Sequence, residues 1–324
     1  MCRSNAWMVC MAVVWMLASC GNRSGKALLP SSSGRPYEVL LVGNEPQLRT
    51  LVRSTLTTEI QGLPQSEPAF DISTIATEQL NALNRQARNI VIIVIDRKSG
   101  GHLRLTHQRD VYASPQVIVR LTAPDVATFK REWPQTAPRL TTLLERAELM
   151  AALRHLKHQS NAEANRRIEE VMHCQLLVPS DLTAWKQGKH FLWFSDNGND
   201  GMRNLCLYTL PLGTDILHGR DSIMQANIPG EEPHMRMTTV NSTVNKWRIK
   251  GKNGERIIVR GLWEMEHDAM GGPFVLHVMT DSIRHRLLVA EAFVYAPAGK
   301  KRNKVKELEA ALYTLYCRQD AKGR

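Results

Sequence analysis

The predicted fold is built around one segment of the sequence, Arg260-Gly-Leu-Trp-Glu-Met-Glu-His-Asp-Ala-Met-Gly-Gly-Pro-Phe-Val-Leu-His-Val-Met279. Apolar, β-prone residues cover 257–265 and 274–279, and the glycines and proline between them favour a turn. A third run of the same kind, 287–295, follows directly. The pattern predicts three consecutive antiparallel strands, and we expect the rest of the chain to pack on that sheet.

The glycines of the predicted turn are expected to have an unusual backbone conformation. Gly271 and Gly272 stand immediately before Pro273. Two glycines in this context predict a positive φ at one or both of them, where a Cβ is penalised.

The first half of the chain alternates β-prone and helical segments. Strands are predicted at 37–43, 70–76, 89–96 and 116–121, and helices at 48–60 and 78–88. Pro134 and Pro138 are expected to interrupt a helix that begins after Asp125, and 139–175 is strongly helical with a break near 160–161. This alternation is typical of an α/β or α+β layer.

The second half adds a hairpin and two helices to the three-stranded sheet. Strands 189–195 and 205–210 form the hairpin, and 214–227 and 303–317 form the helices. The predicted fold is α+β, with antiparallel sheets and packed amphipathic helices, in two halves of similar outline. The predicted organisation is a signal peptide at 1–19, a lipidated tether at 20–36, and halves at 37–175 and 176–324.

The N-terminal residues are typical of a signal peptide. Arg3 is the only charge before Cys20, and 7–16 is an apolar run. This run is shorter than the about 20 apolar residues that a membrane-spanning helix needs. Leu17-Ala-Ser-Cys20 resembles the bacterial lipobox, which implies that Cys20 becomes the mature N-terminus and carries a lipid on its thiol. A plain secretory signal is the alternative.

The residues after Cys20 bear on the location. Gly21 follows instead of an aspartate, and no acidic run follows. By analogy with bacterial lipoproteins, this favours the outer membrane and its periplasmic face.

Charge and cysteine usage fit an exported protein. The formal net charge is +11, which favours an anionic partner. Because an exported chain does not meet nucleic acid, we expect an envelope protein, lipid headgroups or a cell-wall polymer; a solvated basic surface is the alternative.

Cys174, Cys206 and Cys317 lack the spacing of a disulfide framework. We expect buried free thiols, with a single disulfide in an oxidising compartment as the alternative.

No metal, cofactor or catalytic motif is predicted. His155 and His158 lack a third ligand nearby, and the polar loop 196–201 departs from the calcium-binding pattern. Four basic residues lie at the start of the last helix, where cations oppose the helix dipole: Lys300, Lys301, Arg302 and Lys304. Their placement suits an anionic contact, with a solvated basic loop as the alternative.

Two polar segments are the candidate binding site. They hold Glu231, Glu232 and His234 in one loop, and Glu266, His267 and Asp268 in the turn. Loops held by a rigid sheet are where binding residues gather. We hypothesise that the two segments form one surface for a basic or hydroxyl-rich partner, with Trp263 as an apolar anchor. Two unrelated solvated turns, with Trp263 in the core, are the alternative.

Three stretches resemble one family. They are Pro30-Ser-Ser-Ser-Gly-Arg-Pro-Tyr-Glu-Val39, Ile228-Pro-Gly-Glu-Glu-Pro233, and Arg260-Gly-Leu-Trp-Glu264 with Ala269-Met-Gly-Gly-Pro-Phe274. Together with the lipobox they resemble the domain of unknown function 4837 family of Bacteroidetes lipoproteins, over essentially all of the mature chain. The resemblance implies an exported, lipid-anchored protein and supplies no catalytic residues.

Two functions follow from these features. The first is a lipid-anchored envelope protein that binds a ligand or partner without catalysis. The alternative is a hydrolase of cell-wall or glycan material that uses acids among Glu264, Glu266 and Asp268. Residues i and i+2 of a strand share a face and are roughly 6.6 Å apart. That separation is compatible with the about 5–9 Å between glycosidase carboxyls.

Overall fold

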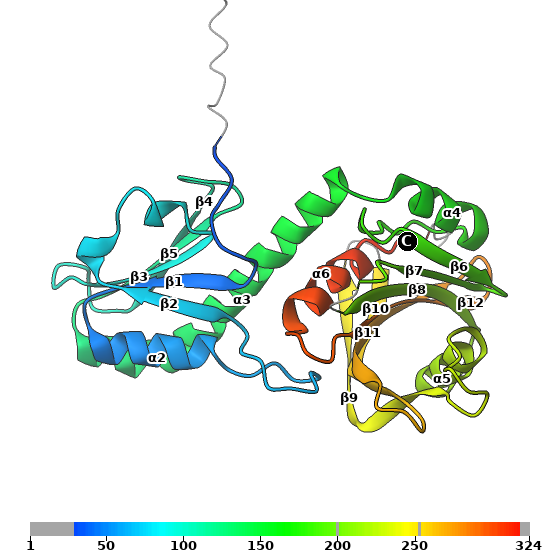
Figure 1. Cartoon of the computed structure of the whole chain (residues 1–324). Coiled ribbons are helices and arrows are strands. Elements are labelled where there is room, and N and C mark those ends of the chain that lie inside the picture. The colour runs from blue at the N-terminus through cyan, green and yellow to red at the C-terminus, as the bar shows by residue number, and fades with distance from the viewer. Residues whose placement is uncertain (1–28, 199–200, 252–253, 318–324) are drawn as a thin grey trace, which may run out of the picture.

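The computed structural model describes residues 29–198, 201–251 and 254–317. The predicted Cys20 lipidation site lies outside these residues. Within them the chain forms two halves, each with its own sheet and core (Figure 1). The predicted α+β fold is confirmed.

The N-terminal sheet has the strand order β2-β1-β3-β5-β4. Its pairs are parallel except for the antiparallel β4–β5 edge. One face is covered by helices α2 (Pro46–Leu56) and α3 (Val126–His158). The strands are β1 (Glu38–Val42), β2 (Asp71–Ile75), β3 (Asn89–Ile95), β4 (Arg104–Arg109) and β5 (Val117–Ala123).

Two helix predictions in this half were wrong. The helix expected at 78–88 is replaced by two short 3₁₀ turns, η1 (Thr77–Gln79) and η2 (Asn84–Gln86). Pro134 and Pro138 lie inside α3 and do not interrupt it. Both prolines are exposed, and because they are four residues apart they share one helix face. Each proline lacks an N–H, so the backbone carbonyl four residues before it has no helical hydrogen bond. These carbonyls lie on the exposed face of the helix, where they meet solvent.

The C-terminal sheet is antiparallel throughout, in the order β6-β7-β8-β12-β11-β10-β9. The predicted hairpin and three-stranded meander are confirmed as β7–β8 and β10–β11–β12. The strands are β6 (Ala184–Gly188), β7 (Phe191–Ser195), β8 (Met202–Pro211), β9 (Met237–Gly251), β10 (Gly254–Met265), β11 (Gly271–Asp281) and β12 (Arg286–Tyr295). The helices are α4 (Ala162–Met172), α5 (Ile216–Asn227) and α6 (Arg302–Leu312).

Both faces of this sheet are buried. Along β12, Leu288 and Ala290 belong to the core under α4 and α6, whereas Val289 and Phe293 belong to the core under α5. Successive side chains on a strand point to opposite faces. A central strand covered on both sides is therefore apolar at most positions, which explains the long apolar runs in the sequence, and Glu291 is a buried charged exception in β12.

The two cores divide the chain near residues 158–161. Ile168 and Met172 of α4 pack in the C-terminal core, so the boundary predicted at 175 falls one helix too late. The halves also differ in topology, since one sheet is mostly parallel and the other antiparallel. Their similar outline in the sequence does not extend to the order of their strands.

The start of α6 holds the halves together. The Glu67 carboxylate accepts hydrogen bonds from the backbone N–H groups of Lys301 and Arg302, at 2.6 and 3.1 Å. The Arg302 guanidinium donates to Asp71 at 2.7 Å. The anionic contact predicted for this basic run is therefore intramolecular. Carboxylates at the N-terminus of α6 offset the unfavourable interaction of its cations with the helix dipole.

Candidate functional site

The two predicted binding segments lie side by side. The rings of His234 and His267 are 5.3 Å apart between centroids. The Glu266 N–H donates to the Arg236 carbonyl at 2.9 Å, and Met237 pairs with Met265 where the strands begin and end. We call the two segments together the two-segment surface. Their six candidate side chains are all exposed: Glu231, Glu232, His234, Glu266, His267 and Asp268.

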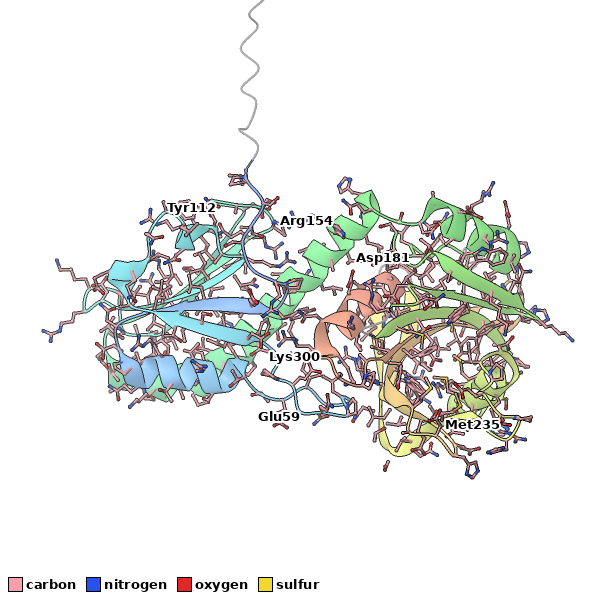
Figure 2. All side chains as sticks on the ribbon, viewed as in Figure 1. Glu59, Tyr112, Arg154, Asp181, Met235 and Lys300 are labelled. Carbon is pink, nitrogen blue, oxygen red and sulfur yellow. The ribbon has the colours of Figure 1, made fainter. Side chains whose placement is uncertain are left out.

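This two-segment surface lies far from the N-terminal half. Figure 2 labels Met235, which belongs to the 229–236 loop, at the outer end of the C-terminal half. Trp263 is 3% exposed and packs edge-on against Phe293, with 5.6 Å between ring centroids. Trp263 is therefore a core residue and not an anchor on this surface, while its neighbour Glu264 is exposed.

Gly271 and Gly272 are required for a different reason from the one predicted. Neither has a positive φ; His267 carries it in this turn, at 63°. A Cβ on Gly272 would lie 2.0 Å from the Val294 carbonyl oxygen, and one on Gly271 would lie 2.9 Å from the Trp263 carbonyl oxygen. The glycines therefore permit close approach of neighbouring strands.

A separate cleft of about 780 Å³ lies between the two halves. The N-terminal half contributes Glu59 from the loop after α2 and Thr141 and Glu145 from α3, and the C-terminal half contributes Trp247, Arg260 and Lys306. Figure 2 labels Glu59 and Lys300 in the region where the halves approach each other. Two smaller hollows also meet at Arg260 and Lys306, which places these two cations at the centre of the interface.

Arg260 is three-quarters buried beside a carboxylate but keeps a free donor. Its Nη2 donates to Glu309, and its guanidinium carbon lies 5.2 Å from the centroid of the Trp247 ring. Its Nε has no hydrogen-bond partner among the described residues. Burial opposes the charge of Arg260, yet the Glu309 carboxylate outweighs it and raises the pKa of Arg260.

A β-bulge sets this geometry. Arg260 pairs with Asn245, whereas Leu262 pairs with Val240, so β9 has extra residues in this register. Bulges bend a strand and re-aim its side chains. Here the second part of β9 brings Asn245 and Trp247 to the rim of the cleft beside Arg260.

Lys306 and Glu145 also have unused hydrogen-bonding capacity. Lys306 lies with its Nζ 6.0 Å from the centroid of the Tyr37 ring and makes no ion pair within the described part of the chain. Glu145 lines the main cleft and one smaller hollow, and it has no hydrogen-bond partner in 29–198, 201–251 or 254–317. The cleft therefore combines free donors, a free acceptor and an indole.

No pattern in the sequence predicted this cleft. Its principal residues come from α3, β9, β10 and α6, which are far apart in the chain. Arg260 is the first residue of the segment 260–279, and an arginine within an apolar strand is an unusual feature. No local pattern connects it with Trp247, Lys306 or Glu145.

Neither a metal site nor a membrane-spanning helix is found in the described residues. They contain no group of three or more histidine, cysteine or acidic side chains placed to bind a metal ion. None of the helices they form combines the length and apolar composition needed to cross a bilayer.

The fold and cleft define a protein of two halves, one built on a mostly parallel sheet and the other on an antiparallel sheet, with a cleft at their junction. Residues 161–314 match the Domain of unknown function (DUF4837), and 32–157 match a second Domain of unknown function (DUF8532). The C-terminal half belongs to the DUF4837 family, as the resemblance predicted, whereas Pro30–Val39 falls largely in the second match. The matches meet where the cores divide. No curated protein matches the chain.

Proposed function

We propose that this chain is a lipid-anchored protein of the cell envelope that binds a hydroxyl-rich ligand in the cleft between its halves, without catalysis. The observation that carries the proposal is Arg260, whose Nε lacks a partner among the described residues and whose guanidinium lines the cleft beside Trp247. A buried unpaired donor costs free energy. Nε itself has almost no exposed surface, so a ligand acceptor would meet the guanidinium where it lines the cleft, and pairing with Nε would need a shift of the side chain.

The chemistry of the lining favours a glycan. A hydroxyl group both donates and accepts, so it can pair with Arg260 or Lys306 on one wall and with Glu145 on the other. The Trp247 indole provides a half-buried apolar surface for the carbon face of a sugar ring. A few placed polar groups beside an aromatic side chain are typical of small-ligand pockets.

The location follows from the N-terminal sequence. Leu17-Ala18-Ser19-Cys20 supports lipidation of Cys20, and the absence of an acidic run after it supports the periplasmic face of the outer membrane. We expect Cys20→Ser to release the protein from the membrane fraction. A variant that stays in that fraction after washing in high salt would show that another segment anchors the chain.

The hydrolase alternative has less support. Glu264, Glu266 and Asp268 are exposed and do not line the cleft between the halves. Glu266 also follows the end of β10 at Met265, so the strand spacing expected between Glu264 and Glu266 does not apply.

Binding of solubilised cell-wall glycan fragments to the Cys20→Ser protein tests the proposal, with calorimetry and tryptophan fluorescence as measurements. Arg260→Lys keeps a cation near Glu309 but loses Nε and the planar fork. We expect it to weaken binding about tenfold or more, as for one charged hydrogen bond, with a similar melting temperature. Glu264→Gln, outside the cleft, is the matched control. Equal affinity for both variants, or no binding by the parent, would reject the cleft as the ligand site.

A further inference from the structure

Cys174 and Cys317 lie at equivalent positions of a short antiparallel contact. Gln175 and Tyr316 exchange both backbone hydrogen bonds, with Gln175 N to Tyr316 O at 2.8 Å and Tyr316 N to Gln175 O at 2.9 Å. One residue outward, Cys174 stands opposite Cys317. In such a ladder this neighbouring position is a non-hydrogen-bonded pair, in which the Cα atoms are about 4.5 Å apart.

That separation falls within the range of a disulfide. Bridged cysteines have Cα atoms about 4.4–6.8 Å apart. Cys174 and Cys317 are 3% and 0% exposed and pack in the same core. Cys206 packs in the core on the other face of the sheet, under α5. The fold thus pairs two of its three described cysteines and separates the third.

The two thiols also share one electrostatic environment. Burial raises the pKa of Cys174 to about 12, and the nearby Cys317 contributes to this shift. Asp281 and Arg286 act on both sulfurs. A buried thiol of this kind is a poor nucleophile in the folded state. Oxidation therefore belongs to folding, before the segment that carries Cys317 docks against Cys174.

We propose that Cys174 and Cys317 form an intramolecular disulfide when the chain folds in an oxidising compartment. The thiolate of one cysteine attacks a disulfide-bearing oxidant, which is a thiol–disulfide oxidoreductase or a small disulfide, and forms a mixed disulfide while the oxidant's second sulfur leaves as a thiolate. The other cysteine then displaces the oxidant. The protein loses two protons and two electrons, and the two sulfurs of the oxidant become thiols, within one molecule for an oxidoreductase and on two molecules for a small disulfide.

The bond would close a loop from the end of α4 to the segment after α6. That loop encloses the whole C-terminal sheet and ends just beyond the helix that carries Lys306 and Glu309. A crosslink of this length limits the unfolded chain strongly. It would also hold α6, one wall of the cleft, against the sheet.

Refolding of the reduced, denatured Cys20→Ser protein in a mixture of oxidised and reduced glutathione tests the geometry. We expect a mass lower by two hydrogens, a peptide linking Cys174 to Cys317, and a melting temperature higher by about 5–15 °C than that of the reduced protein. Cys206→Ser should retain all three results, and Cys317→Ser should lose them. Alkylation of both Cys174 and Cys317 after oxidation, or a bond that mainly involves Cys206, would overturn the proposal.

The glutathione experiment does not depend on the proposed cleft function or on export. In cells, formation of the bond rests on the proposed envelope location. Thiol alkylation in protein taken directly from its native cells should therefore find the bond. Free Cys174 and Cys317 in those cells, with a bond that forms in glutathione, would reject the oxidising location.

Discussion

Two arginine–glutamate pairs lie on opposite faces of the C-terminal sheet, and they differ in how completely the arginine is bonded. Arg220 of α5 pairs with Glu291 of β12 on the α5 face. Arg260 of β10 pairs with Glu309 of α6 on the other face.

Arg220 is fully buried and fully bonded. Its Nε and Nη2 donate to Glu291 at 3.0 and 2.8 Å, and its Nη1 donates to Asp221 at 2.9 Å and Thr239 at 3.1 Å. The Tyr208 hydroxyl donates to the same glutamate at 2.8 Å. This network satisfies the charges it buries, and it has no access to a ligand.

Arg260 is bonded in part. Its Nη2 contacts Glu309, while its Nε has no partner in the described residues and its guanidinium lines the cleft. A buried ion pair by itself therefore indicates no function. An incompletely bonded pair at a cavity does, because natural proteins leave few buried polar groups unpaired.

The largest loss of stability is expected when the arginine of each ion pair is replaced by methionine. Arg220→Met leaves Glu291 buried without a cation and should lower the free energy of unfolding by about 3–5 kcal/mol. The matched Arg260→Met should cost less, about 1–2 kcal/mol, because Lys306 also lowers the pKa of Glu309 beside the cleft. Urea unfolding measures both. Equal losses would mean that the two pairs serve the same structural role.

Gly272→Val should have the next largest effect. The added Cβ would meet the Val294 carbonyl oxygen at 2.0 Å, and the resulting shift would move β11 just before Phe274. The Phe274 ring lies 4.4 Å from the Arg220 guanidinium carbon. We expect a loss of about 2–4 kcal/mol in urea unfolding. Gly271→Val, with a contact of 2.9 Å, should lose less; the reverse order would contradict the packing argument.

The Arg260 face also carries a pH-dependent group. Burial lowers the pKa of His277 to about 3, and Arg256 and Arg260 add to this effect against the opposing charge of Glu309. His277 is therefore neutral in the fold but takes up a proton when unfolded below pH 6.5 or so. Its contribution to stability is complete above that pH and declines as the pH falls toward 3.

The expected loss from this group is about 1.4 kcal/mol per pH unit below the unfolded value. Urea unfolding at pH 7, 6, 5 and 4 measures it, with His277→Gln as the comparison. The variant should lose stability less steeply over this range. Parallel profiles would show that His277 does not titrate between the two states.

The smallest expected effect on stability is at the two-segment surface. Glu231→Lys with Asp268→Lys changes exposed side chains, so we expect a change within about 0.5 kcal/mol. Ligand binding in the cleft should be unchanged, while any basic partner that co-purifies from membranes should be lost. A folded double variant that retains every partner would reject the hypothesis of a binding surface there.

Edge strands explain most of what the sequence analysis missed in the fold. The unpredicted strands β4, β6 and β9 all lie at a sheet edge, and most of their residues are exposed or half-exposed. An edge strand is covered on fewer sides, so it lacks the apolar run or clean alternation that identifies a central strand. The central strands β3, β10, β11 and β12 were all predicted.

Local patterns in the sequence predicted the central strands and most of the amphipathic helices. The turn before β11 was expected to include Gly271, Gly272 and Pro273, but these residues already belong to β11 and the turn lies at 266–270. Tertiary structure alone decided the cleft and the Cys174–Cys317 pairing. The cleft depends on a bulge in β9, on the docking of α6 against Glu67, and on α3 running unbroken between the halves. Periodicity shows that a side chain is buried, but not which distant group it meets. That depends on contacts between segments far apart in the chain, and these contacts decide that Arg220 is fully bonded and Arg260 is not.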